Sequence, residues 1–159
     1  MIILAIRSAA KAIILHNSKV LINKCVQSDT NSVYYDLPGG GQHQFENLEE
    51  AVVREVLEET GYNINVVRFT GIAEEIQTNE EIRKVYSDYA HRIVHIFIAR
   101  LVDNSKVLPS ETDFQQTESI WMDLDEADHV CFRPQQLTGK ISMLVTNDIP
   151  FYFGCTYVQ

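Results

Sequence analysis

The sequence predicts a single α/β domain over residues 1–159, in which a mixed sheet packs against helices. Three observations support this prediction: a capped amphipathic helix lies between Asn47 and Gly61, a nearly continuous apolar run covers residues 90–101, and shorter β-prone runs lie before and after them. Helices and strands that alternate along a chain bury their apolar faces by stacking in layers. No repeat, low-complexity tract or flexible linker suggests a domain boundary.

The N-terminal part is predicted to form a β-hairpin over residues 8–26. Two β-prone runs are separated there by the turn residues His16, Asn17 and Ser18, which is the usual hairpin pattern. His16 is therefore expected to be a solvated turn residue. A further short strand is expected over residues 33–37.

The helix between Asn47 and Gly61 carries its own start and stop signals. Asn47 and Glu50 have the spacing of a capping box, and Gly61 stands where a helix ends in the left-handed conformation. Apolar residues recur at helical spacing and predict one buried face. They are Leu48, Val52, Val56 and Leu57.

After this helix, residues 64–76 alternate like a strand that is interrupted at Gly71. Residues 77–90 and 103–117 are polar and are expected to be loops. Between them, residues 90–101 are apolar at almost every position, which is typical of a central strand covered on both faces.

The C-terminal part is predicted to contain a strand over residues 119–122, then a short helix for which Asp123 and Glu126 form a capping box. Pro134 is expected to open a second helix, and residues 151–158 form a final strand. The apolar stripe of the second helix consists of Leu137, Ile141, Leu144 and Val145.

Three carboxylates are unusual for a helix that serves only folding. Glu55, Glu58 and Glu59 share one face, where like charges repel, and two of them lie in the last turn, where the helix dipole disfavours anions. Each effect costs about 0.3–1 kcal/mol. We therefore expect a positive group against this face, and a hard cation such as Mg²⁺ prefers carboxylate oxygens. A solvated acidic face is the alternative.

Residues upstream favour the metal interpretation. Pro38, Gly39, Gly40 and Gly41 precede the helix, and glycines allow the backbone to approach a ligand closely. From Gly40 onward the chain resembles the signature of the Nudix hydrolase family (MutT-like), G-x(5)-E-x(7)-R-E-U-x-E-E-x-G-U. The matching positions are Gly40, Glu46, Arg54, Glu55, Val56, Glu58, Glu59 and Gly61.

Two positions depart from the family pattern. Tyr62 replaces the closing aliphatic residue, and Phe45 stands where members often carry glycine, which affects the expected loop shape. The resemblance implies an α/β/α sandwich with a mixed β-sheet. It also implies a pyrophosphohydrolase that cleaves a diphosphate bond in a nucleoside diphosphate linked to another group, with Mg²⁺ as cofactor and Mn²⁺ as a substitute.

The resemblance also implies roles for residues. Glu58 and Glu59 are expected to bind the metal together with the carbonyl group of Gly39, and Glu55 is expected to be a ligand or the general base. The implied catalytic set is Arg54, Glu55 and Glu59, and it leaves open which glutamate is the base.

Arg54 is expected to pair with Glu50 and to hold the glutamates in place, although a plain surface salt bridge is the alternative. Glu46 is expected to orient the loop rather than to touch the metal. Gly40 and Gly41 are expected to contact the substrate.

Outside the motif, the family often adds a metal-binding carboxylate from a later loop. Glu118 is the first candidate and Glu111 the second, and a solvated glutamate is the alternative for each. His91 and His95 lie on one face of their strand, and His95 is a candidate phosphate contact or else a structural histidine.

Aromatic residues offer candidate stacking surfaces for a base. Tyr35 is a candidate substrate contact, while core packing is the alternative for Tyr34 and Tyr35. Tyr86 and Tyr89 either stack on a base or fill a loop.

Bulk properties exclude some functions. The net charge of −9 disfavours binding to a nucleic acid polymer, and no apolar run is long enough for a membrane span. The first residues are too short for a signal peptide. Three cysteines without metal-type spacing predict free thiols in a reducing cytoplasm. A small nucleotide is thus the expected partner, and a homodimer is compatible with the sequence.

The substrate stays open at this point. Some relatives specific for ADP-ribose carry a proline beyond the motif, where this chain has Gln77, Thr78 and Asn79. Nucleoside triphosphates, sugar nucleotides and dinucleotides remain. Two other classes compete: a Nudix-type isomerase, disfavoured because the motif is intact and no cysteine lies near it in the sequence, and a non-catalytic nucleotide-sensing domain, which usually loses motif glutamates.

Overall fold

The first hairpin forms as the sequence predicts. The computed structural model describes residues 5–159, and in it β1 (Arg7–His16) and β2 (Lys19–Val26) pair antiparallel. Asn17 and Ser18 connect them with φ values of 48° and 61°, the left-handed conformations of a two-residue hairpin turn. The N-terminal segment judged too short for a signal peptide lies largely in residues 1–4, outside the described residues.

The strands form one eight-stranded mixed sheet. Its main path runs β3-β2-β1-β6-β5-β8, while β4 pairs with β1 and β7 pairs with β2. The pairs β1–β6 and β5–β8 are parallel. The remaining strands are β3 (Val33–Asp36), β4 (Gly39–Gly41), β5 (Ile64–Gln77), β6 (His91–Leu101), β7 (Gln116–Asp123) and β8 (Phe151–Val158).

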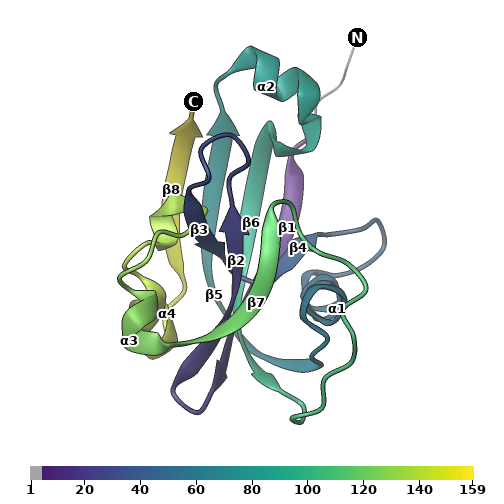
Figure 1. Cartoon of the computed structure of the whole chain (residues 1–159), viewed down its shortest axis with the longest axis vertical. Coiled ribbons are helices and arrows are strands. Elements are labelled where there is room, and N and C mark those ends of the chain that lie inside the picture. Colours follow the sequence, from purple (N-terminus) through teal and green to yellow (C-terminus); the bar gives the residue numbers. More distant parts are fainter. Residues whose placement is uncertain (1–4) are drawn as a thin grey trace.

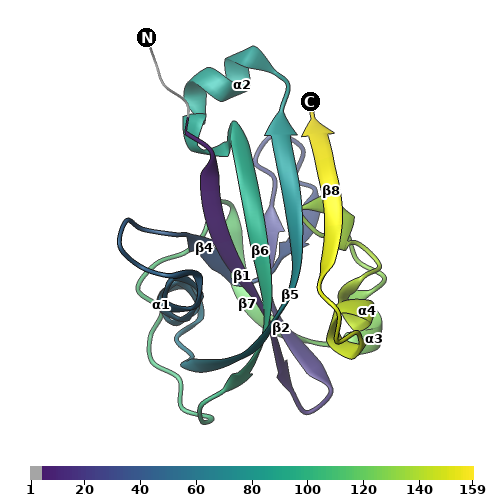
Figure 2. The ribbon, with the colours of Figure 1, turned by 180° about the vertical axis from the view of Figure 1, so that it is seen from behind.

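Helices cover the sheet on both sides (Figures 1 and 2). On one side α1 (Leu48–Thr60) packs through Val52 and Val56 against Ala12 and Phe97. On the other side α3 (Leu124–Ala127) and α4 (Ile141–Thr146) enclose a second core. The predicted sandwich is therefore confirmed.

Strand β6 lies between β1 and β5, and a hydrophobic core covers each of its faces. Val94 and Ile96 face the core under α3 and α4, whereas Phe97 and Ala99 face the core under α1. This position explains why the run is apolar at almost every residue. Gly71 marks a register shift in the neighbouring strand β5, as the interrupted pattern predicts.

Three expectations about secondary structure were wrong: the loop over residues 77–90, the single helix after Pro134 and the capping box of Asp123. Residues 77–90 contain the short helix α2 (Glu80–Val85) and the 3-10 helix η1 (Ser87–Tyr89). The stretch after Pro134 divides at Gly139 (φ 72°) into η2 (Gln135–Leu137) and α4.

Asp123 precedes α3, but its side chain makes no capping bond. It pairs instead with Lys19, 3.2 Å away, and this competing charge explains the missing capping box. Over residues 5–159 no helix has the length and apolar character that a membrane crossing requires. The three cysteines all lie within this range, and none forms a disulfide.

Candidate active site

Helix α1 begins and ends as predicted. The Asn47 side chain accepts from the backbone N–H of Glu50 at 2.9 Å, and Glu50 Oε2 accepts from Asn47 at 2.8 Å. Gly61 closes the helix with φ 77°. These caps fix the ends of the helix, and hence the direction in which its glutamates point.

Arg54 is the centre of an outer cluster that also contains Glu46, Glu55 and Glu58. Its guanidinium group makes two hydrogen bonds to Glu46 (2.7 and 3.0 Å), one to Glu55 Oε1 (2.9 Å) and one to Glu58 Oε2 (3.1 Å). The expectation that Arg54 pairs with Glu50 was wrong, because the Glu50 carboxylate accepts a hydrogen bond from the backbone of Asn47 in the capping box. The positive group expected against the acidic face is thus partly supplied by the helix itself.

Glu46 orients the loop before the helix, as expected. It accepts from the backbone N–H of His43 at 2.8 Å, and Arg54 also donates to the carbonyl oxygen of Gly41 at 2.9 Å. The hydrogen bonds of Arg54 lower the pKa of Glu46 to about 2. Phe45 has φ 68°, a conformation that glycine adopts more easily, and its side chain is fully exposed.

Glu55 lies against the glycine loop. A methyl group added to Gly40 would lie 2.5 Å from Glu55 Oε2, closer than unbonded atoms approach. Glycine at position 40 therefore allows the Glu55 carboxylate to approach the backbone of the glycine loop closely. An open cleft of about 560 Å³ begins here, and its wall includes Arg7, Gly41, His43, Glu46 and Glu55.

Glu59 points away from this cleft into the protein. Only 4% of it is exposed, and its Oε2 accepts from Asn23 Nδ2 at 2.9 Å and from the Gly39 N–H at 3.1 Å. Burial raises the pKa of Glu59 above its usual range, although the charge of Lys11 opposes this.

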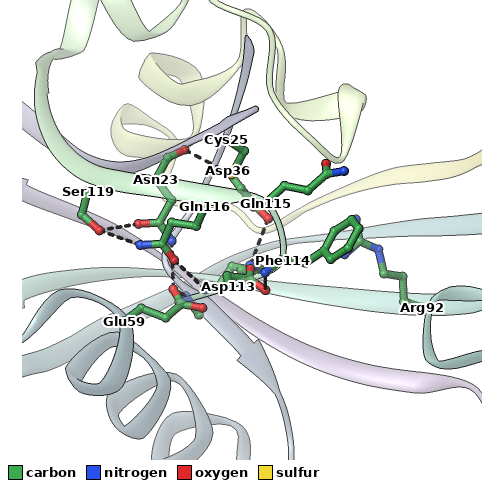
Figure 3. A network of polar contacts seen from close by, with 12 residues as sticks. Asn23, Cys25, Asp36, Glu59, Arg92, Asp113, Phe114, Gln115, Gln116 and Ser119 are labelled. Carbon is green, nitrogen blue, oxygen red and sulfur yellow. Dashed lines mark hydrogen bonds and ion pairs between the residues drawn. The ribbon is translucent and has the colours of Figure 1, made fainter. Parts of the chain in front are cut away.

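Glu59 belongs to an inner cluster, whose other members are Lys11, Asn23, Asp36 and Asp113 (Figure 3). Lys11 Nζ donates to Asp36 Oδ2 at 3.1 Å and to Asp113 Oδ2 at 3.2 Å. Burial would lower the pKa of Lys11, but the charges of Asp36 and Asp113 outweigh it and raise that pKa well above its ordinary value. Gly39 is the strand partner of Lys11, so the glycine loop adjoins both clusters.

Sequence reasoning missed Lys11, Asn23, Asp36 and Asp113. One signal was present, because Lys11 interrupts a run of small and apolar residues in β1, and a charged residue in a buried strand needs a partner. The partners lie in β3 and in the loop before β7. No local spacing connects these segments.

The structure places Glu118, the first candidate for an outer metal ligand, apart from the other predicted ligands. Glu118 pairs with Lys24 across β7 and β2, 3.4 Å apart, and more than half of its side chain is exposed. The neighbouring residues Asn23 and Ser119 bond to each other at 2.7 Å on the side of Glu59. Because successive strand residues point to opposite faces, Glu118 faces away from α1.

The second candidate, Glu111, lies beside the end of α1. Its backbone N–H donates to the carbonyl oxygen of Glu58 at 3.1 Å, while its side chain is exposed. The loop carboxylate that reaches the interior is Asp113. Both of its oxygens have protein partners: Lys11 for Oδ2 and the Phe114 N–H for Oδ1.

The two candidate substrate contacts outside the motif lie elsewhere. Tyr35 packs against Phe132, with ring centroids 6.4 Å apart, in the core under α3 and α4. Tyr35 thus lies where the core-packing alternative places it. His95 Nδ1 lies 3.0 Å from the carbonyl oxygen of Ala9, and the ring lines a separate hollow beside Phe69, which matches the structural alternative.

The carboxylates of α1 have the chemistry of a magnesium site without its assembled geometry. Arg54 occupies Glu55 Oε1 and Glu58 Oε2, and the described residues donate no hydrogen bond to the second oxygen of either group. Hard cations prefer such oxygens. Between residues 5 and 159, however, no three His, Cys, Asp or Glu side chains are grouped closely enough to hold a metal. The predicted set of Glu55, Glu58, Glu59, Gly39 and Glu118 is thus not brought together as one cluster.

Comparison with known proteins relates this arrangement to a family. The family model described as "NUDIX domain" matches residues 5–140. A protein from Bacillus subtilis named "Putative 8-oxo-dGTP diphosphatase" is 45% identical over 47 residues, which are 30% of this chain and 32% of that protein. The chain therefore aligns with about a third of the length of this curated relative.

Solved structures share the fold at low sequence identity. A NUDIX hydrolase from Nitrosomonas europaea has a TM-score of 0.61 at 21% identity, over 89% of this chain and 86% of that one. An ADP-ribose pyrophosphatase from Streptococcus suis has a TM-score of 0.61 at 17% identity, over 96% of this chain and 100% of that one. At this level of identity the likeness shows the fold.

Proposed function

The chain belongs to the NUDIX domain family, and on that premise we propose that it hydrolyses a diphosphate bond in a nucleoside diphosphate linked to another group, with a divalent cation as cofactor. The observation that carries the proposal is the outer cluster. Arg54 holds Glu55 and Glu58 side by side, and Glu55 lines an open cleft. A helix with no function at this face would not need to gather like charges there.

The names of the relatives support the substrate class. The Bacillus subtilis relative is named for 8-oxo-dGTP, and the Streptococcus suis structure is named for ADP-ribose. Both compounds contain a nucleoside diphosphate unit, and they differ in what that unit carries. We therefore assign the common unit to this chain and leave the attached group open.

Each residue near the cleft has a role in this proposal. A bound Mg²⁺ would neutralise diphosphate charge and lower the pKa of a water molecule, and the free oxygens of Glu55 and Glu58 would hold the ion. Arg54 fixes both carboxylates. Glu55 lines the cleft, whereas Glu59 is buried and committed to Asn23 and Gly39, so Glu55 is the better placed group to accept a proton from water.

The isomerase alternative requires a cysteine that exchanges protons near a carboxylate. Cys25 is labelled in Figure 3, and its Sγ lies 3.9 Å from the carbonyl oxygen of Asn23, a member of the inner cluster. Burial raises the pKa of the Cys25 thiol to about 12, so the thiolate is scarce at neutral pH. This disfavours the isomerase.

A substrate panel tests the proposal. Nucleoside triphosphates, sugar nucleotides and dinucleotides would be incubated with Mg²⁺ or Mn²⁺ at mildly alkaline pH, and nucleoside monophosphate and phosphate products would be quantified. We expect turnover of at least one member, a loss of about a hundredfold or more in Glu55→Gln, and wild-type turnover in the exposed control Glu118→Gln. No turnover of any member by the wild-type protein would instead favour a nucleotide-sensing domain.

A further inference from the structure

Lys11 is a buried cation that the chemistry proposed above does not use. Only 3% of it is exposed, and its ammonium group contacts two carboxylates, those of Asp36 and Asp113. Strands β1 and β3 fix the positions of Lys11 and Asp36. Asp113 lies instead in residues 102–115, a stretch without regular structure. The pair between Lys11 and Asp113 therefore ties a loop to the sheet.

The same loop is also attached to the C-terminal end of α1, through residues that precede Asp113. The backbone N–H groups of Ser110 and Glu111 donate to the carbonyl oxygen of Glu58 at 2.9 and 3.1 Å, and Val107 N–H donates to that of Gly61 at 2.9 Å. Glu58 is one of the glutamates held by Arg54. The loop thus connects the end of the glutamate helix to the buried lysine.

A third contact joins the loop to the segment that contains α2 and η1. Phe114 packs on Tyr86 and Tyr89, with ring centroids 5.6 and 6.0 Å apart. These aromatic contacts are partly exposed, since Phe114 and Tyr86 are nearly half accessible. The attachment to Lys11 is an ion pair whose cation is only 3% exposed, so water competes with it less than at an exposed pair.

We propose that Lys11 is a positioning residue whose ion pair with Asp113 holds residues 102–115 closed against the end of α1. The proposal rests on the proposed function for its effect on catalysis, and on geometry alone for its effect on the loop. With the loop closed, the carbonyl end of α1 beside Glu58 is covered and its orientation is fixed. With the loop open, the hydrogen bonds from Ser110 and Glu111 are lost, and the last turn of α1 becomes freer to move.

The two carboxylates that contact Lys11 determine which variant tests the proposal. Asp113→Asn removes one of two negative charges next to Lys11 and leaves a balanced pair with Asp36, so folding is preserved. The new Asn Oδ1 can still accept from the Phe114 N–H. Asp36→Asn is the matched control, because it removes the other charge from the same lysine but alters a strand instead of the loop.

Hydrogen exchange measured by mass spectrometry tests the loop directly and needs no substrate. We expect exchange at residues 107–111 to be about a hundredfold faster or more in Asp113→Asn than in wild type, and within twofold of wild type in Asp36→Asn. Unchanged exchange in Asp113→Asn, or the same increase in both variants, would overturn the proposal.

Steady-state kinetics test the consequence for catalysis. If substrate binds productively only to the closed loop, opening lowers the competent fraction and raises the apparent KM. We expect Asp113→Asn to raise KM about threefold or more, with kcat within twofold of wild type. A lower kcat at unchanged KM would show that Asp113 acts in the chemical step and would overturn the positioning role. If wild type turns over no substrate, the proposed function fails, and the exchange experiment still decides on the loop.

Discussion

Arg54 and Lys11 each gather carboxylates around one cation, but in different surroundings. Arg54 lies at the edge of a cleft, about a quarter exposed, and its partners Glu46, Glu55 and Glu58 are all within eight residues of it. Lys11 is buried, and its partners Asp36 and Asp113 are 25 and 102 residues away. The first cluster is built by a helix and its preceding loop, whereas the second is built by the tertiary fold.

The difference determines what each cluster contributes. The outer carboxylates are partly exposed, by 15% to 27% of each side chain, so they keep part of their hydration and can exchange a protein partner for a metal ion at modest cost. Buried charges depend on one another, because a group that loses its partner cannot turn to water. We therefore assign chemistry to the outer cluster and positioning to the inner one.

The largest effect on stability is expected when Lys11 is made neutral. Lys11→Met leaves the buried Asp36 and the partly buried Asp113 without the cation that both contact, which typically costs about 3–5 kcal/mol. Urea denaturation at pH 7 would measure the free energy of unfolding. A loss below about 1 kcal/mol would mean that water reaches the inner cluster, and the contrast with Arg54 would disappear.

A smaller loss of stability is expected at the outer cluster. Arg54→Lys keeps the charge but loses the fork that bonds three carboxylates and a carbonyl at once, and hydrogen bonds to charged groups contribute about 1.5–3 kcal/mol. We expect a loss of about 2 kcal/mol, with turnover falling much more than stability. Wild-type turnover in Arg54→Lys would show that the fork does not position Glu55 and Glu58.

Sequence alone predicted the outer cluster better than the inner one for a physical reason. Capping boxes, helical spacing and the glycine loop are local, so the caps Asn47 and Gly61 and the shared face of the glutamates follow from their separation along the chain. The buried pair of Lys11 and Asp113 depends on how β1 meets a distant loop. The inward turn of Glu59 likewise depends on Asn23 in β2.

The candidates outside the motif show the same limit. Glu118 was chosen as a carboxylate near Trp121 and Tyr35 as an aromatic side chain, but which face of a strand they occupy depends on the register of β7 and β3 with β2. A shift of one residue would move either side chain to the opposite face. The strands and the layered α/β architecture were predictable because hydrophobic runs are local signals.

The outer and inner clusters should also differ in how the free energy of unfolding changes with pH. Because Arg54 lowers the pKa of Glu46 to about 2, Glu46 contributes stability above its ordinary pKa of about 4.5, and that contribution is lost as the pH falls toward 2. In Glu46→Gln we expect a loss of about 1–2 kcal/mol at pH 6 that shrinks toward zero at pH 2. Thermal melts over this range would show it, and a loss that is constant with pH would contradict the charged pair.

The smallest effect is expected at Glu59, and it has the opposite sign. Burial raises the pKa of Glu59, so its ionisation in the folded protein lowers stability as the pH rises above its ordinary value. Glutamine can still accept from Asn23 and Gly39. In metal-free buffer we expect Glu59→Gln to be as stable as wild type at pH 5 and more stable, by about 1 kcal/mol or less, at pH 9. A variant that loses stability at pH 9 would show that the charge itself is needed there.

The most direct test of the account is Mn²⁺ binding followed by electron paramagnetic resonance, with Mn²⁺ standing in for Mg²⁺. Wild type, Glu58→Gln and the exposed control Glu118→Gln would be titrated under the same conditions after their folds are verified by circular dichroism. The account predicts that Glu118→Gln binds like wild type, and that Glu58→Gln binds at least tenfold more weakly. Equal binding by all three proteins would show that the glutamates held by Arg54 are not the metal site, and would contradict the central claim.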